Sequence, residues 1–389
     1  MMSTDRTPVL VAATRTPVGR LNGTLAHLSA VDLGAAAVGA VLEPFDGELA
    51  VDHIYLGNVV QAGNGQNPAR VAAIRGGVPT TVPGTTVNDV CLASMTGVGL
   101  AATQIRAGEI DTAIVGGFES MSRAPHGARI RTAAKTGHQE FVDLLVNDGL
   151  WCALSDSGMG ELSDAANREL GIGRADQDEF AQESHRRARV AKETGRLKQE
   201  IGALTDVLEA DEGIRPDATI EKLSRLPAAF TADGTITAGN ASQMSDAGAA
   251  GVLMSRARAD SLGLSPLVEV VDRTVVAGPD PTLHLKPAAA AGKLLARNGL
   301  STSEVGLWEI NEAFAGVVLA SARELDVDLE RINVNGGAIA LGHPLGASGF
   351  RLLLTLAFEM RRREVEFGVA AICGGGGQGQ AVLLRLTQP

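Results

Sequence analysis

The sequence repeats one arrangement of segments, and this duplication limits the folds that are open to the chain. Residues 32–63 and 286–316 each read as a small-residue helix, a polar connection, a short strand and a loop that ends in glycine. Each copy then continues with a strand, a helix and a buried strand, at 85–117 and again at 331–375. The predicted strands are 85–90, 112–117, 331–336 and 367–375, and the predicted helices are 93–108 and 348–365. The period is far longer than that of a solenoid repeat, so we predict two similar α/β domains packed together.

A different kind of segment separates the two copies. Residues 120–244 are richer in polar groups and contain a predicted amphipathic helix at 175–195, with acidic residues in its first turn, basic residues later and Gly195 at its end. Residues 239–255 then return to small, apolar side chains. The predicted division is a first domain of residues 1–119 plus 245–267, an inserted loop domain of residues 120–244, and a second domain of residues 268–389.

Composition excludes several classes of protein. The 389 residues are 45% hydrophobic and 20% charged, and no stretch approaches the roughly 18 apolar residues that span a bilayer. The N-terminus lacks the pattern of a signal peptide, so we expect no membrane span and a cytoplasmic location. A net charge of -11, with 9 Phe, 2 Trp and 1 Tyr, argues against nucleic acid as a partner. Local basic groups could still bind an anionic small molecule.

Three cysteines are candidates for chemistry. Cys91, Cys152 and Cys373 are odd in number and far apart, which fits a reducing compartment better than a disulfide framework. Cys91 lies at a predicted strand-to-helix turn, and Cys373 precedes four glycines. Cys152, in "GLWCALSD", is interpreted as an inert buried filler. His343, in "LGHPLGASG", occupies the corresponding turn of the second copy, so pseudo-twofold packing would bring it opposite Cys91.

Each motif alone has another interpretation. "CGGGGQG" could bind a phosphate, but it lacks the Lys-Ser/Thr ending of a P-loop and the features of a dinucleotide fingerprint. His343 beside Pro344 could cap the following loop, and Asn311 in "NEAFA" could form a strand-end Asx turn. The other six histidines, including His126 and His185, read as surface or structural residues.

Several motifs, taken together and in order, resemble one known family. "VNDVCLASM", "GGFESMSRAP", "GNASQMSDAGAA", "NEAFA", "GGAIALGHPLGASG" and "CGGGGQG" are similar to motifs of the thiolases, acetyl-CoA C-acyltransferases of the 3-ketoacyl-CoA class, nearly end to end. The resemblance implies the thiolase fold: two duplicated α/β domains packed as a five-layered α-β-α-β-α core, with an inserted loop domain that binds coenzyme A. It also implies acyl-CoA thioesters as substrates, no metal or redox cofactor, and a homodimer or homotetramer.

The chemistry of acyl transfer between thiols assigns roles to the candidate residues. A thiol of ordinary pKa, near 8.5, is only a few per cent ionised at neutral pH. The positive end of a helix dipole at Cys91 would lower its pKa, and His343 could take its proton. Carbon–carbon cleavage needs a second acid/base, for which Cys373 is the candidate. By resemblance, Gly375 and the Cys91 amide form one oxyanion hole, and Asn311, through a water, and His343 form the other.

Resemblance alone suggests the coenzyme A contacts. Ser242 would contact the pantetheine arm, and Arg215 the nucleotide phosphates. The residues that would line the arm are Ala313, Phe314, Phe230 and Met159. Without the resemblance, Phe230, Met159 and Phe314 would be interpreted as core residues.

The sequence departs from the family pattern at two places. Leu92 and Ala93 follow the nucleophile where thiolases usually have Gly-Ser, and Gly158 stands where many biosynthetic members have histidine. These differences favour thiolysis of a 3-ketoacyl-CoA of undefined chain length, by a ping-pong mechanism through an acyl-cysteine. The alternatives are a biosynthetic acetoacetyl-CoA thiolase, a non-catalytic acyl-CoA-binding paralogue, and a decarboxylating condensing enzyme, which would use a second histidine at the position of Asn311.

Overall fold

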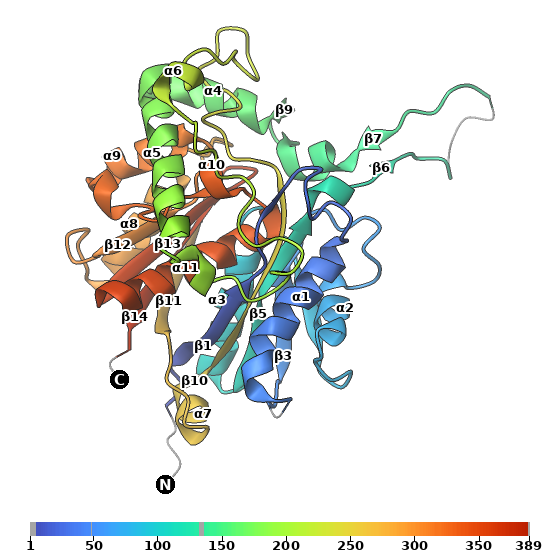
Figure 1. The fold of residues 1–389 in the computed structure, drawn as a ribbon, viewed down its shortest axis with the longest axis vertical. Coiled ribbons are helices and arrows are strands. Elements are labelled where there is room, and N and C mark those ends of the chain that lie inside the picture. The colour runs from blue at the N-terminus through green and yellow to red at the C-terminus, as the bar shows by residue number, and fades with distance from the viewer. Residues whose placement is uncertain (1–4, 48, 132–135, 388–389) are drawn as a thin grey trace.

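One large twisted sheet runs through the protein. The structure is a computed structural model that describes residues 5–47, 49–131 and 136–387. The sheet has ten strands in the order β12-β13-β14-β11-β1-β10-β5-β3-β4, with β2 paired to β10 (Figure 1). Their bounds are β1 Pro8–Arg15, β2 Gly19–Arg20, β3 His53–Gly57, β4 Gly84–Val87, β5 Thr112–Ser120, β10 Ser245–Ser255, β11 Val268–Ala277, β12 Leu307–Ile310, β13 Phe367–Gly374 and β14 Gln378–Leu386.

The strand order shows the duplication directly. The central strands β1 and β11 pair antiparallel, with Val9 opposite Glu269 and Leu10 opposite Val268. Outward from β1, the strands β10 and β5 follow antiparallel and β3 follows parallel to β5. Outward from β11, the strands β14 and β13 follow antiparallel and β12 follows parallel to β13. The two halves of the sheet therefore share one topology over four strands each, with β4 as an additional strand beside β3 in the first half, which confirms the predicted pair of similar α/β units.

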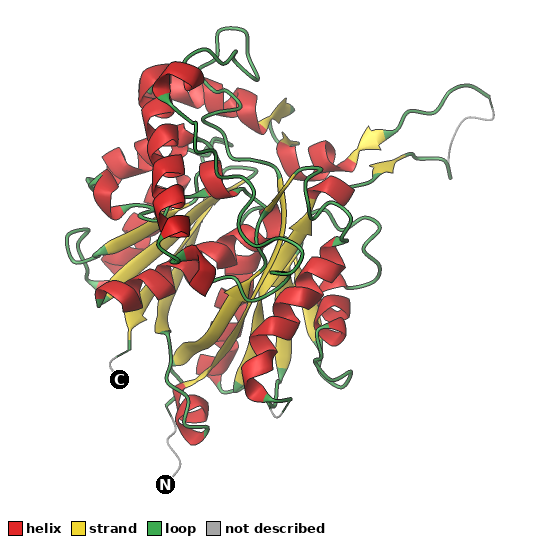
Figure 2. Cartoon of the chain, in the orientation of Figure 1, coloured by secondary structure: helices red, strands yellow, loops and turns green. Residues whose placement is uncertain are grey.

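Helices cover and separate the two halves of the sheet (Figure 2). The bounds of the helices are α1 Ala30–Leu42, α2 Pro68–Arg75, α3 Ala93–Ala107, α4 Met159–Leu170, α5 Arg174–Glu193, α6 Ile220–Leu223, α7 Arg256–Ser261, α8 Lys286–Asn298, α9 Ala315–Leu325, α10 Ala338–Leu341 and α11 Leu345–Arg363. Helices α3 and α11 pack against each other and against strands of both halves, while α1 and α2 cover one outer face and α8 and α9 cover the other. The order of layers is α-β-α-β-α, as the resemblance implied.

Glycine makes the close contact between α3 and α11 possible. A Cβ atom on Gly349 of α11 would lie 2.8 Å from both the Cβ and the backbone nitrogen of Met95 on α3. The Phe350 N–H donates a hydrogen bond of 2.9 Å to the Ser94 Oγ across the same contact. The first turns of the two central helices are thereby fixed beside each other.

One predicted strand is wrong. Residues 331–336 form a loop, in which Ile332 makes a single parallel bridge with Trp308. Asn333 and Gly336 have φ angles of 48° and 78°, and such left-handed conformations interrupt an extended strand. The Asn333 side chain donates to the carbonyl of Ile310 and accepts from its N–H, which replaces the missing ladder bonds.

The segment between β5 and β10 lies outside the shared topology. β5 and β10 are antiparallel neighbours in the sheet, and the chain between them carries α4, α5, α6 and two short hairpins. The hairpin strands are β6 His126–Gly127, β7 Val142–Asp143, β8 Trp151–Cys152 and β9 Ser157–Gly158. Helix α5 packs on α9 and α10 of the second half and has Asp176 in its first turn and Lys192 in its last, as predicted for 175–195. The exact division into three domains stays a prediction.

Among the helices in the described residues, none combines the length and apolarity required to cross a membrane.

Substitution of two helical glycines by alanine should change the stability of the fold in opposite directions. Gly349→Ala should destabilise the fold by about 1–3 kcal/mol, because its methyl group has no room against Met95. Gly292→Ala, in α8, should stabilise it by about 0.5–1 kcal/mol, because a Cβ there meets nothing within 4 Å and alanine favours helix. Thermal melting measures both. Equal shifts in melting temperature would show that the contact between α3 and α11 is not tight.

Candidate active site

Two junctions that lead into the central helices, one from each half of the chain, form the candidate site. Cys91 lies between β4 and α3, and His343 lies between α10 and α11. Because the first turns of α3 and α11 are in contact, the two junctions lie at the same edge of the protein. Leu345, two residues after His343, packs in one apolar cluster with Cys91.

The second cysteine approaches the first from the end of β13. Burial raises the pKa of the Cys373 thiol, and Cys91 is close enough to raise it further. The Gly375 N–H donates a hydrogen bond to the Cys91 sulfur. Gly376 and Gly377 have φ angles of 79° and 73°, so these glycines supply the left-handed turn that brings the Gly375 amide to the thiol.

The expected effect of the helix dipole on Cys91 is not found. The pKa of the Cys91 thiol is raised to about 12, chiefly by burial; the Gly375 N–H opposes this rise, and the nearby carboxylates of Glu119 and Asp89 contribute to it. Desolvation therefore outweighs the helix N-terminus at this position. The resting thiol is neutral, so a base must take its proton when it reacts.

His343 has the tautomer that such a base needs. Its Nδ1 lies 2.6 Å from the Ser348 Oγ, and that hydroxyl donates to the carbonyl of Pro344 at 2.9 Å. The Ser348 oxygen therefore accepts a hydrogen bond from the Nδ1–H of His343, and Nε2 keeps its lone pair. Burial, and then the positive charge of Arg351, lower the pKa of His343 to about 3. Among the described residues Nε2 has no hydrogen-bond partner.

Asn311 presents a second unpaired group. It follows β12, and its backbone N–H donates to the carbonyl of Ala371 at 3.0 Å. Its side chain is fully buried, yet neither the amide oxygen nor the amide nitrogen has a partner in the part of the chain that the structure describes. A buried amide that the protein leaves unpaired is available to a substrate oxygen or a water.

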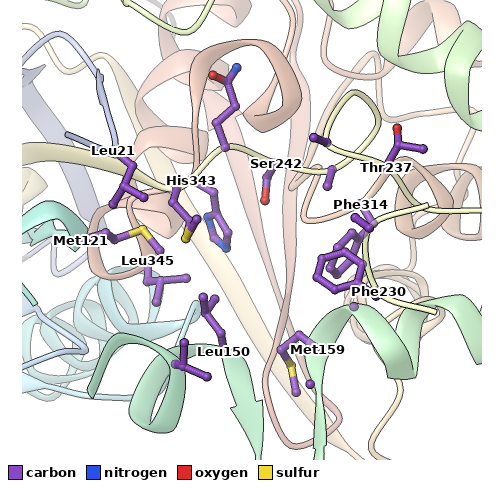
Figure 3. Close-up of a pocket in the computed structure, with 18 of the residues that line it drawn as sticks. Leu21, Met121, Leu150, Met159, Phe230, Thr237, Ser242, Phe314, His343 and Leu345 are labelled. Atoms are coloured by element: carbon purple, nitrogen blue, oxygen red, sulfur yellow. The ribbon is translucent and has the colours of Figure 1, made fainter. Parts of the chain in front are cut away.

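An apolar cavity of about 610 Å³ opens over these groups. Figure 3 shows His343 near its centre, Leu21, Met121, Leu150 and Leu345 on one side, and Phe230, Phe314 and Met159 on the other. Ser242 and Arg215 also line it.

The remaining predicted residues lie behind the cavity wall. Cys373 and Ala313 pack with the wall residues Phe314 and Met159 in one cluster, and the Ser242 N–H donates to the carbonyl of Ala313 at 3.1 Å. Cys91 packs with the wall residues Met121 and Leu345. Cys91, Cys373 and Ala313 thus lie next to the wall of the cavity.

The sequence interpretation missed part of the wall. The lining residues not predicted include Arg20, Leu21, Met121, Val146, Leu150, Trp151, Met244 and Leu345. Met121, Met244 and Leu345 lie within motifs that carry the family resemblance, which could have marked them, whereas the others come from separate segments without a shared local signal. Cys152 is buried, as expected of a filler; burial acts to raise the pKa of its thiol, but hydrogen bonds from Ser155 and from the N–H groups of Leu154, Ser155 and Gly376 lower it overall.

Comparison with known proteins identifies the family. The model of the thiolase N-terminal domain matches residues 8–257, and that of the thiolase C-terminal domain matches residues 264–386. The chain belongs to the thiolase family. Like other thiolases, it is an acyltransferase.

Similar thiolases occur in several bacteria. A probable acetyl-CoA acetyltransferase of Mycolicibacterium smegmatis is 46% identical over 97% of this chain and 100% of its own length. A probable acetyl-CoA acetyltransferase of Escherichia coli is 45% identical, and an acetyl-CoA acetyltransferase of Pseudomonas aeruginosa is 44% identical, each over 97% of this chain and 98% of the relative.

Removal of the Ser348 hydroxyl should slow the reaction. Ser348→Ala should lower kcat about 10–100-fold, because Nδ1 of His343 would lose its acceptor, at a cost of about 1–3 kcal/mol, and the tautomer would no longer be fixed. The control is Ser321→Ala, which removes another buried hydroxyl, one that donates to the carbonyl of His284. It should leave kcat unchanged. Equal kcat values for the two variants would contradict the role of Ser348.

The pH profile of kcat/KM should lack the fall at low pH that protonation of an ordinary histidine causes. Because the pKa of His343 is lowered to about 3, its imidazole stays unprotonated at pH 5, where a free histidine is mostly charged. We expect kcat/KM to be level between about pH 5 and 8, with circular dichroism at each pH to verify folding. An acid limb with its midpoint near 6.5 would contradict this.

Proposed function

We propose that the protein catalyses the thiolysis of 3-ketoacyl-CoA to acetyl-CoA and a shortened acyl-CoA, by a ping-pong mechanism through an acyl group on Cys91. One observation carries the proposal. The imidazole of His343, with Nε2 unpaired, lines one apolar cavity, two neighbouring thiols pack behind its wall, and an unpaired amide lies three residues before Phe314 of that wall.

In the first half-reaction, the His343 Nε2 takes the proton of Cys91 as its sulfur attacks the 3-keto carbon. The N–H groups of Gly375 and Cys91 stabilise the oxyanion that forms there. The bond between the second and third carbons then breaks, and its electron pair forms the enolate of acetyl-CoA. Cys373 protonates the enolate carbon and becomes a thiolate, while Asn311 and His343 stabilise the enolate oxygen.

In the second half-reaction, coenzyme A enters and its thiol gives its proton to the Cys373 thiolate. The coenzyme A sulfur attacks the acyl carbon on Cys91, and the shortened acyl-CoA leaves. The Cys91 sulfur takes back its proton from His343, so each group returns to its starting state. The steps use a thiol, an imidazole and amides and require no metal or redox cofactor.

A second candidate is acetyl transfer between two acetyl-CoA molecules. The name of the relatives, acetyl-CoA acetyltransferase, favours acetyl transfer. Gly158 and Leu92, and the apolar side of the cavity at Leu21, Met121 and Leu150, favour a longer acyl group. We propose thiolysis as the principal reaction, by a cytoplasmic homodimer or homotetramer in fatty acid metabolism, without a nucleic-acid partner.

The acyl-enzyme provides the test. Incubation with 3-ketooctanoyl-CoA or acetoacetyl-CoA, without free coenzyme A, should give an adduct of the matching acyl mass on the intact protein. Cys91→Ser should lack the adduct and lose on the order of 10³-fold or more in kcat, whereas Cys152→Ser should still carry the adduct. The ratio of the kcat/KM values for the two substrates gives the preference for acyl-chain length. An unmodified wild-type protein would refute covalent catalysis.

A further inference from the structure

The amide that reaches the nucleophile belongs to a loop made only of glycine. This glycine loop, residues 374–377, ends β13 and forms the turn to β14. The Gly375 N–H donates to the Cys91 sulfur, and the proposed mechanism uses the same N–H to stabilise an oxyanion. Glycine has no side chain to pack and loses more conformational freedom on folding than any other residue. Neighbouring segments must therefore fix the position of this amide.

The two sequence neighbours of Cys91 pack against the glycine loop. A Cβ on Gly374 would lie 2.9 Å from the Cγ of Leu92 and 3.1 Å from its Cδ1. A Cβ on Gly375 would lie 3.4 Å from the Cγ1 of Val90. Leu92 is fully buried, so its side chain fills the space directly beside Gly374. The segment that carries the nucleophile thus restrains the loop that carries the oxyanion donor.

The hairpin of β8 and β9 also contacts the glycine loop. The Gly376 N–H donates to the Cys152 sulfur, which accepts the N–H of Leu154 as well. A Cβ on Gly376 would lie 3.6 Å from the Cδ1 of Leu154. Successive amides of the loop therefore donate to two sulfurs, one on the nucleophile and one on the hairpin.

The same hairpin forms part of the cavity wall. Leu150 directly precedes β8 and Met159 directly follows β9, and both line the cavity (Figure 3). Trp151 and Gly158, which pair with each other across the hairpin, line it as well. Cys152 is the next residue along β8, and its sulfur bonds to the glycine loop. A substrate in the cavity therefore contacts the element that also restrains the loop.

We propose that Cys152 and Leu92 are positioning residues that keep the Gly375 N–H directed at the reacting sulfur and at the oxyanion. This inference rests on the proposed function. Both residues act through the glycine loop: Cys152 accepts the amide that follows the oxyanion donor, and Leu92 packs beside the start of the loop. Because an oxyanion donor stabilises the transition state only from the correct position, loss of either residue should lower kcat more than it changes KM.

Substitution of Cys152 tests the hydrogen bond from Gly376. Cys152→Ala removes the acceptor and should lower kcat for thiolysis of acetoacetyl-CoA about 10–100-fold, with KM changed less than about threefold, because a misplaced donor weakens the transition state. Cys152→Ser keeps an acceptor and should retain kcat within about threefold of the wild type. An unchanged kcat in Cys152→Ala, or equal losses in the two variants, would contradict the positioning role of the sulfur.

Substitution of Leu92 tests the packing beside Gly374. Leu92→Ala should lower kcat about 10-fold without a comparable change in KM. The control is Leu294→Ala in α8, which removes an equally buried side chain from the outer face of the second half. It should lower the melting temperature by a similar amount and leave kcat unchanged. Equal kcat values for the two variants would show that Leu92 serves stability alone.

Alkylation separates this proposal from the proposed function, because it needs no turnover. Iodoacetamide reacts with the thiolate, which the Gly375 N–H stabilises. At about pH 8.5, Cys152→Ala should modify Cys91 at least about threefold more slowly than Cys152→Ser, as measured by peptide mass spectrometry. Slower modification would support the proposal even if no thiolysis were detected. An equal rate, or a faster rate caused by an opened site, would overturn it even if thiolysis were confirmed.

Discussion

The close approach of α11 to the first half of the sheet is the constraint on which the site depends. A Cβ on Gly117 of β5 would lie 2.0 Å from the Gly346 carbonyl oxygen, and one on Gly57 of β3 would lie 2.7 Å from the same atom. The buried carboxyl group of Glu119 accepts the N–H groups of Gly346, Val59 and Val60 at 3.0–3.2 Å. Glycine permits this contact and a carboxyl group fixes it, so the start of α11 is fixed on a surface formed by the other half.

Burial then sets the proton chemistry of the two reacting groups. It raises the pKa of Cys91 and lowers the pKa of His343, so both groups are neutral at rest. A neutral pair needs no counter-charge in an apolar site, whereas a permanent thiolate would be costly there. In the proposed mechanism the Cys91 thiol stays protonated until it attacks a substrate. Amide donors then stabilise the oxyanion that forms on the substrate.

The sequence was sufficient to predict the architecture, and the reason is physical. Small-residue helices and buried strands recur in the same order, so the duplicated α/β core and the insertion could be inferred before any contact was known. The strand at 331–336 could not be judged correctly, because the left-handed conformation of Asn333 depends on its side-chain bonds to Ile310. Apolar alternation alone does not reveal such bonds.

The candidate site was predictable only where a motif marks it. Cys91, Asn311, His343 and Cys373 lie in motifs with recognisable neighbours, and the structure places Cys91, His343 and Cys373 at one cavity. The pKa of Cys91 could not be predicted, because it depends on how deeply other segments bury the thiol. Leu150 and Arg20 come from unrelated segments, and only the folded chain shows that they share a wall.

In the described residues the two halves of the sheet meet through two residue pairs between β1 and β11. In the proposed mechanism the first half contributes the sulfur that becomes acylated, and the second contributes the groups that move protons. The two repeats therefore supply different groups to the proposed site, and neither repeat contains all of them. The proposed reacting groups come together only where the two repeats pack against each other.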